Sequence, residues 1–299
     1  GASASYGKYS VFMAASNGFT ANYDRSSNSV SCVAIAGEGL NMERDYDADT
    51  RVYQSDLRPS DEIGRTAGLR AVERVNPRRP ATGSYPVIYD ERISSGLVGH
   101  FLSAINGAAI TRGSSWLKDS LGKQVLPSTC KLVENPHRLR AGASRLFDSE
   151  GLATKKREIL SKGVLNGWTL DLASARKLGM KPTANASRNV SSNPSPTNWN
   201  IELSSPEDYC DNLLSEMGNG LLVTSLIGST INPNTGDYSR GVSGFWVENG
   251  QICYPVSEIT IAGNLRDMLK KIILGNDAQR HLSYVVPSIL VEEMTLAGS

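Results

Sequence analysis

The sequence predicts an α+β protein dominated by antiparallel sheet. A strand meander and a helix come first, and a larger domain follows whose sheet curls into a barrel-like shape. Residues 8–52 alternate apolar and polar side chains in short runs, which is typical of half-buried strands. Asn249-Gly250 lies between two apolar runs, as in a tight β-hairpin. The 28 glycines and the aromatic content of only 7% favour turns and strand edges over a helical bundle. Strands flanked by such turns close into antiparallel sheets more easily than into βαβ units.

The first 76 residues are expected to form the meander and its helix. Turns are predicted at Asn17-Gly18 and at 37–39. Ser60 is expected to cap a helix that ends before Asn76-Pro77. The apolar stripe of this helix consists of Ile63, Ala67, Ala71 and Val75. The two prolines within 76–80 exclude a helix there and limit strand pairing, so this segment is the predicted linker between a domain at 1–76 and a C-terminal domain at 84–299.

The C-terminal domain is expected to contain most of the sheet. Predicted strands lie at 87–89, 131–133, 159–160, 164–165, 221–227, 245–247, 252–254 and 288–291. Predicted helices lie at 93–111, 205–218 and 264–273, and the Asn/Ser/Pro-rich stretch at 183–200 is a predicted long loop.

Composition restricts the function. Lysine and arginine (31) nearly balance aspartate and glutamate (30), so the net charge is +1. This balance argues against a protein that binds nucleic acid through phosphates. The four cysteines form no CxxC pair, and no apolar run approaches the roughly 20 residues of a membrane span. We therefore expect a cytoplasmic protein with reduced thiols and no membrane partner. The start at Gly1, in strand-like sequence, suggests a fragment of a longer protein.

The residues alone show no complete catalytic constellation. Neither a phosphate-cradling loop nor a G-x-S-x-G elbow is present. The Ser-x-x-Lys pairs lack the companion motifs of serine–lysine enzymes. The three histidines are far apart in sequence, without an HExxH pattern. His100 lies in a mostly apolar helical stretch, which favours a core or interface histidine over a metal ligand.

Several collinear segments resemble the PmbA/TldE branch of the TldD/PmbA family, whose members are called modulators of DNA gyrase or TldD/E metalloproteases. The clearest are GDYSRG at 236–241, GFWVENG at 244–250 and YPVSEITIAGNL at 254–265. Shorter matches lie at 37–39, 42–47, 105–110, 145–148, 275–277 and 294–295. The resemblance covers essentially the whole chain. Members of the family normally carry a further N-terminal α/β region, which is missing here.

The resemblance also bears on zinc. The TldD branch binds zinc through an HExxxH helix and a late cysteine. Counted back from Arg112-Gly113, the two histidine positions fall on Val98 and Ser103, and the glutamate position falls on Gly99. No cysteine follows Cys253. The resemblance therefore implies a chain with no catalytic residue and no zinc of its own, active as a peptidase only with a zinc-bearing TldD-like partner.

A peptide groove is the one binding site predicted within the chain. Peptidases commonly bind unfolded chains by strand addition, and glycine lets another backbone approach closely. The groove hypothesis assigns four residues: Tyr238, Arg240, Gly241 and Trp246. The alternative interpretation is a plain turn before a buried aromatic strand, because glycine in strands often marks only a bend.

Three function classes remain open at this stage. The first is a non-catalytic subunit of a metalloprotease that degrades unfolded peptides and processes peptide precursors, paired with a TldD-like subunit or with a second copy of itself. The second is a self-sufficient peptidase with an unrecognised site. The third is a regulatory protein that binds DNA gyrase. Zinc content separates the first from the second, and the co-purifying partner separates the first from the third.

Overall fold

A computed structural model describes residues 1–206 and 208–298. The chain divides into two compact units. Unit 1 comprises Gly1–Arg78 with Leu139–Gly142, and unit 2 comprises Arg79–Arg138 with Ala143–Ser299. Within the described ranges, no helix is long and apolar enough to span a membrane.

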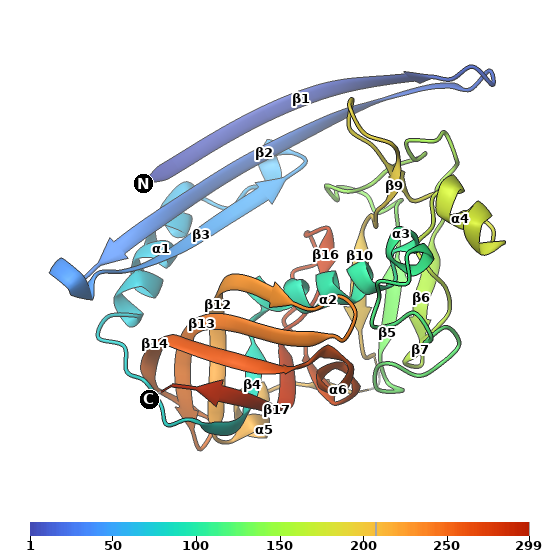
Figure 1. The fold of residues 1–299 in the computed structure, drawn as a ribbon. Coiled ribbons are helices and arrows are strands. Elements are labelled where there is room, and N and C mark those ends of the chain that lie inside the picture. The colour runs from blue at the N-terminus through green and yellow to red at the C-terminus, as the bar shows by residue number, and fades with distance from the viewer. Residues whose placement is uncertain (207, 299) are drawn as a thin grey trace. The chain divides into compact units, whose positions relative to one another are not determined.

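Unit 1 is a three-stranded antiparallel sheet with one helix packed against it (Figure 1). Its elements are β1 (Ala2–Ala14), β2 (Thr20–Ala36), β3 (Glu43–Arg51) and α1 (Ser60–Glu73), with short 3-10 turns at Gly39–Asn41 and Gln54–Asp56. The predicted turn joins β1 to β2: Gly18 has a φ of 91°, and Asn17 Oδ1 accepts a hydrogen bond from the Phe19 amide. The predicted meander and helix are therefore present.

Three aspartates on β3 face α1. Asp45, Asp47 and Asp49 alternate along the strand, so the two-residue period places them on one face of the sheet, where they are buried. Arginines on α1 and just before it pair with two of them: Arg74 with Asp45 at 3.3 Å, Arg70 with Asp47 at 3.2 Å, and Arg58 with Asp47 at 2.5 Å. The same interface buries three apolar residues of α1: Ile63, Ala67 and Ala71. The helix is thus held to its sheet by ion pairs as well as by apolar packing.

Unit 2 is built around a closed ring of five strands in the order β4, β12, β13, β14, β17 and back to β4. These strands are β4 (Gly83–Tyr89), β12 (Gly220–Ile231), β13 (Asp237–Glu248), β14 (Gln251–Asn264) and β17 (Ile289–Ala297). β4 pairs in parallel with β12 and antiparallel with β17, which closes the ring. The other three pairings are antiparallel. The predicted α+β fold with a barrel-like, mainly antiparallel sheet is confirmed.

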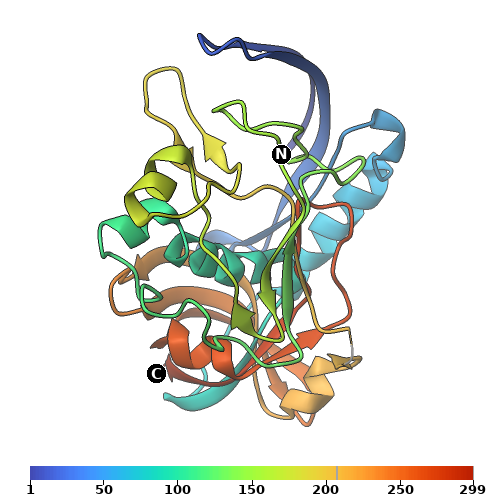
Figure 2. The same ribbon diagram turned by 90° about the vertical axis from the view of Figure 1, so that its right-hand side faces the viewer.

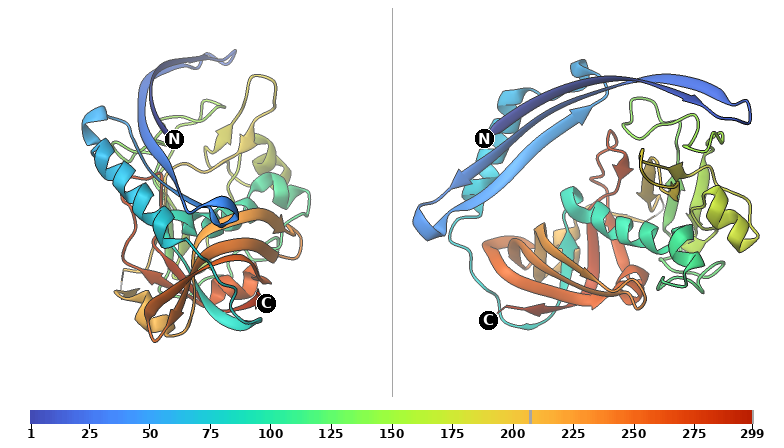
Figure 3. Two further views of the ribbon diagram at one scale, coloured as in Figure 1. Left: turned by 90° about the vertical axis from the view of Figure 1, so that its left-hand side faces the viewer. Right: turned by 45° about the horizontal axis from the view of Figure 1, so that its top comes forward.

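Helix α2 (Glu91–Ala104) follows β4 and lies alongside the strands of the ring (Figure 3). Its apolar side, which includes Leu97, Val98 and Phe101, belongs to the same buried cluster as Val223 and Ile261 of the ring. The side chain of Asp90 accepts a hydrogen bond from the Arg92 amide and caps the helix. The core of unit 2 therefore fixes α2 at one side of the ring.

A second sheet packs onto the same core, in the order β16, β10, β5, β6, β7 (green strands in Figure 2 for β5 to β7). Its strands are β5 (Lys131–Glu134), β6 (Arg157–Ser161), β7 (Val164–Leu165), β10 (Ile201–Ser204) and β16 (Tyr284–Val285). The remaining elements are α3 (Gly107–Thr111), α4 (Leu172–Leu178), β8 (Ala186–Ser187), β9 (Ser195–Pro196), β11 (Tyr209–Cys210), α5 (Leu213–Met217), α6 (Leu265–Lys270) and β15 (Ile272–Gly275). β15 and β11 extend the first sheet beyond β17.

Several predicted helices differ from the observed ones. The helix predicted at 93–111 is broken into α2 and α3, because the Gly107 amide bonds to the Thr169 carbonyl and Asn106 caps α3. The helix predicted from Ser205 is much shorter. Residues 209–210 pair with β15 instead, and Asn212 caps α5; Glu207, part of the predicted cap, lies outside the described residues. Ser60 is the first residue of α1, and its N-cap position is Pro59, without a side-chain cap.

Replacing Asp47 by alanine is expected to loosen α1 from its sheet by about 2–3 kcal/mol, since it leaves two arginines without their shared carboxylate. Hydrogen exchange of the α1 amides in the full chain measures this loss. Asp61→Ala removes an exposed carboxylate from the first turn of the same helix and is expected to cost less than about 1 kcal/mol. Equal effects of the two variants would contradict the role assigned to the β3 carboxylates.

Candidate functional site

Three of the four predicted groove residues, Tyr238, Arg240 and Gly241, lie at one end of β13. Tyr238, Arg240 and Val242 occupy alternate positions, so their side chains share the face of β13 that points into the core of unit 2. Tyr238 and Val242 are almost fully buried, and Arg240 is partly exposed. Gly241 lies opposite Ile227 of β12. A Cβ atom at Gly241 would lie 3.5 Å from Ile227, which is an ordinary contact distance.

The fourth predicted residue, Trp246, lies farther along β13 in a separate aromatic group. Its ring packs edge-on against Tyr85, with 5.0 Å between centroids, and stacks near Tyr254 at 6.5 Å. Its Nε1 donates a hydrogen bond to Glu248 Oε1 at 3.0 Å. Because only 8% of Trp246 is exposed, its surroundings are those of a core residue. The structure therefore does not bring Trp246 together with the other three.

A polar cluster forms around Arg240. It brings together Tyr89 at the end of β4, His100 on α2, and Tyr238 and Arg240 on β13. The Tyr238 ring centroid lies 6.5 Å from that of Tyr89 and 6.0 Å from that of His100. The glycine-rich sequence indicates Tyr238 and Arg240, but no local pattern indicates Tyr89 and His100 as their neighbours. The cluster joins residues that are far apart in sequence and meet only when the ring closes.

Burial and the Arg240 charge set the protonation states in this cluster. Burial raises the pKa of Tyr89 well above its ordinary value, and the adjacent Tyr238 raises it further. Burial also raises the pKa of Tyr238, although its interaction with Tyr89 and the Arg240 charge oppose this shift. The pKa of His100 is lowered, first by burial and then by repulsion from Arg240. Both tyrosines and His100 are therefore uncharged at neutral pH, which leaves Arg240 as the charged member.

One side of α2 is unusually bare next to this cluster. Gly96, Gly99, His100 and Ser103 recur at helical spacing, so they lie on one side of the helix. No atom approaches within 4 Å of the position that a Cβ atom would take on Gly99, and Ser103 is exposed. Val98 lies on the opposite, core-facing side of α2 and is only 5% exposed.

The TldD branch of the family binds zinc, but the residues at the matching positions of this chain do not fit a zinc site. Of the three positions matched to the zinc motif, Val98 points into the core, and Gly99 and Ser103 lie on the other side of the helix. The Ser103 hydroxyl donates to the Gly99 carbonyl at 2.9 Å. Among the described residues, no group of three or more His, Cys, Asp or Glu side chains is close enough to hold a metal ion.

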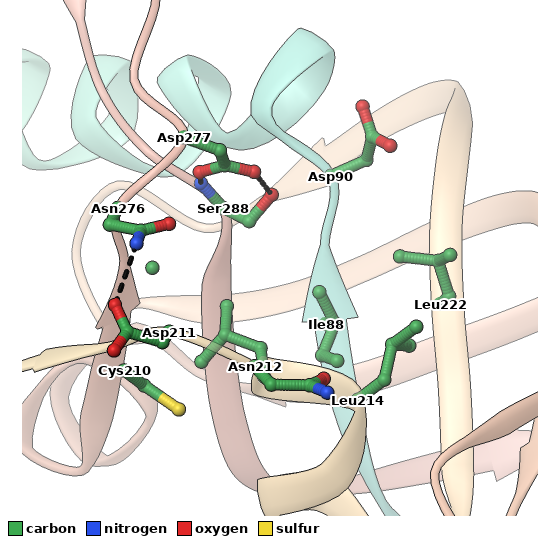
Figure 4. A pocket seen from close by; sticks show the side chains of 12 residues that line it. Ile88, Asp90, Cys210, Asp211, Asn212, Leu214, Leu222, Asn276, Asp277 and Ser288 are labelled. Atoms are coloured by element: carbon green, nitrogen blue, oxygen red, sulfur yellow. Dashed lines mark hydrogen bonds between the residues drawn. The ribbon is translucent and has the colours of Figure 1, made fainter.

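A separate cavity of about 250 Å³ lies between β4, β12, β15 and the segment carrying α5 (Figure 4). Its carboxylates are already bound within the chain: Asp90 by Arg92, Asp211 by Asn276 at 2.7 Å, and Asp277 by the Ser288 amide at 2.7 Å and hydroxyl at 2.6 Å. None of the predicted groove residues lines it. These side chains stabilise the surrounding loops rather than present free groups to a ligand.

Replacing Arg240 by glutamine is expected to raise the pKa of His100, because the change removes a positive charge that disfavours the imidazolium. Burial, the larger cause of the lowered pKa, persists in the variant. NMR titration of the His100 ring protons measures the change, with His137 and His281 as internal references. An unaltered His100 titration would show that the guanidinium does not act on this ring.

Trp246→Ala is expected to destabilise unit 2 by about 3–5 kcal/mol, as is usual for the loss of a large buried aromatic side chain. Arg240→Ala serves as the comparison and is expected to leave the unfolding midpoint of unit 2 nearly unchanged. Urea unfolding followed by tryptophan fluorescence measures the Arg240 variant, and circular dichroism measures both. A stable Trp246→Ala variant would contradict the structural role of the ring.

Comparison with known proteins identifies the family. The sequence profile of the PmbA/TldA metallopeptidase central domain matches residues 2–75, and that of the PmbA/TldA metallopeptidase C-terminal domain matches residues 82–298. The chain is 43% identical over 284 residues to Metalloprotease PmbA of Escherichia coli O157:H7, covering 95% of this chain and 61% of that protein. It thus spans about three-fifths of the length of that relative.

Solved structures agree with this assignment. The crystal structure of a candidate modulator of DNA gyrase from Bacteroides thetaiotaomicron superposes with a TM-score of 0.90 at 30% identity, covering 100% of this chain and 66% of that one. TldE from Thermococcus kodakarensis has the same fold, with a TM-score of 0.87 at 19% identity over 99% of this chain and 69% of that one. The chain therefore belongs to the PmbA/TldA metallopeptidase family, in its PmbA/TldE branch.

Proposed function

We propose that this chain is part of a PmbA/TldE-type subunit that binds unfolded peptides and acts in a metalloprotease together with a zinc-bearing, TldD-like subunit. The observation that carries the proposal is the composition and orientation of α2. Valine at position 98 offers no electron pair to a metal, serine at 103 is a poor ligand, and glycine at 99 has no general base. Zinc-dependent hydrolysis by the assembly would need residues from a second subunit.

The packing of α2 also supports the proposal that zinc is bound by a second subunit. Val98 lines an apolar part of the core together with Phe101, Leu132 and Leu203. The side chain at position 98 therefore packs in the core and carries no atom that could bind a metal ion. The helix serves here as a packed wall of unit 2, and the side that carries Gly96, Gly99 and Ser103 has few side-chain atoms.

Peptide binding is supported by a free strand edge beside that outer side. β4 pairs with only three residues of β12, Leu221 to Val223, and in the described chain no strand pairs with this edge of β12 beyond them. Ile227 on this stretch is 63% exposed. The Gly96 Cβ position lies 4.0 Å from Leu226, so α2 runs close to the free edge. Main-chain groups at an open edge bind extended peptides with little dependence on sequence.

The proposal predicts that the purified chain holds no stoichiometric zinc and hydrolyses no peptide by itself. Mixing it with a TldD-like subunit is expected to produce peptide hydrolysis above that of the TldD-like subunit alone. Elemental analysis measures zinc, and a fluorogenic unstructured peptide measures turnover for each subunit and for the mixture. One zinc per chain that disappears in a His100→Ala variant, together with turnover by the chain alone, would establish a self-sufficient peptidase instead.

Affinity capture with the tagged chain tests the partner. Recovery of a TldD-like subunit supports the proposal, and light scattering distinguishes that complex from a homodimer. Recovery of DNA gyrase in place of a TldD-like subunit would favour a regulatory function, in line with the name of the Bacteroides protein. A chain that stays monomeric and captures neither would contradict the proposed assembly.

A further inference from the structure

Arg240 differs from two other poorly exposed arginines of this protein, Arg74 and Arg157. Arg74 pairs with Asp45 in unit 1, and Arg157 pairs with Glu134 in the second sheet of unit 2. The ion pairs found among the described residues include none to Arg240. Its Nε atom is buried and has no hydrogen-bond partner there. A poorly hydrated charge without a counter-ion is costly, so Arg240 is a candidate to bind an anion from outside the chain.

The groups around Arg240 are arranged to donate hydrogen bonds. The Tyr89 hydroxyl donates to Met294 Sδ at 3.4 Å, and the neighbouring Tyr238 carries a hydroxyl that can itself donate. The His100 ring packs against Tyr238 and carries one N–H in its neutral form. The cluster therefore presents one full positive charge and two further donors, and none of its members is an anion. A planar anion with two acceptor oxygens is the chemical complement of this set.

The cluster can be reached by a peptide main chain. Arg240 is partly exposed, and the outer side of α2 beside it carries no side chain at Gly96 and Gly99. The free edge of β12 begins just after Val223, and its exposed Ile227 lies opposite Gly241, the residue next to Arg240. A strand bound along that edge would lie two strand spacings, about 10 Å, from β13, which a peptide side chain or terminus and the Arg240 side chain together can span.

We propose that Arg240, with Tyr238 and His100, forms a binding site for a carboxylate of the bound peptide, supplied either by its C-terminus or by an acidic side chain. This site rests on the proposed peptide-binding function and adds to it a preference among substrates. The strand edge gives affinity for any extended peptide, and the Arg240 cluster fixes where along that peptide a negative charge is accepted.

Binding of three fluorescein-labelled ten-residue peptides to the full chain tests the site. All have one neutral, unstructured sequence. The first ends in a free carboxylate, the second in an amide, and the third in an amide but carries one central glutamate. Anisotropy titration is expected to give a Kd about tenfold lower for the first or the third peptide than for the second. Whichever of the two binds more tightly identifies the source of the carboxylate.

Matched variants connect this preference to the cluster. Arg240→Gln is expected to abolish the difference between acidic and neutral peptides, and Arg240→Lys to retain part of it. Tyr238→Phe is expected to reduce it. Arg266→Gln removes an exposed positive charge on α6 and is expected to leave all three affinities unchanged. A difference that survives in Arg240→Gln would overturn the assignment.

A second measurement needs no variant and so does not depend on how the variants fold. The pKa of His100 in the native chain, followed by NMR, is expected to rise on addition of the carboxylate peptide, because the bound anion offsets the Arg240 charge. Acetate at high concentration is expected to act in the same direction. Equal binding of all three peptides with no change at His100 would leave peptide binding intact and refute the carboxylate site. A response of His100 to acetate without peptide binding would retain the anion site and refute the peptide function.

Discussion

The double pairing of β4 is the constraint on which unit 2 depends. This seven-residue strand pairs in parallel with β12 and antiparallel with β17, and so closes the ring. It also leads directly into α2 and so sets where the helix begins beside the ring. The Asp90 amide bonds to the Val223 carbonyl directly where β4 ends, which turns the chain into the helix. Because β4 is short, most of β12 continues past it paired with β13 on one edge only, and among the described residues no strand pairs with its other edge. One strand length therefore produces the closed core, the position of α2 and the open edge together.

Local patterns in the sequence predict most of the strands and helices, but they do not predict which strands pair with one another. Alternation and turn chemistry identify the hairpin at Asn249-Gly250, where both residues adopt positive φ values. Ring closure, in contrast, pairs segments about 200 residues apart: Tyr89 and Met294, 205 positions apart, are in contact. The sequence pattern of β4 gives no indication of β17. The buried Glu134 binds Asn185, Asn198 and the Trp199 amide and so orders much of the predicted long loop. No local pattern in the sequence indicates these long-range hydrogen bonds.

The candidate site was only partly predictable for the same reason. Tyr238 and Arg240 were selected because they lie in a glycine-rich run, which is local information. Their neighbours Tyr89 and His100 come from β4 and α2, and a single sequence does not place those elements against β13. The sequence indicates the importance of Arg240 only through the two-residue alternation of Tyr238, Arg240 and Val242. A single charged residue among apolar residues on one face of a strand is often functional or paired with another charge.

The ion pairs between β3 and α1 make the two units respond differently to their solvent. Unit 2 is stabilised mainly by a large apolar core, whereas the α1 interface of unit 1 also depends on arginine–carboxylate attraction. Guanidinium chloride is a salt and screens that attraction while it solvates apolar surface, but uncharged urea leaves the attraction in place. Urea and guanidinium chloride are therefore expected to weaken the α1 interface to different extents relative to the core of unit 2.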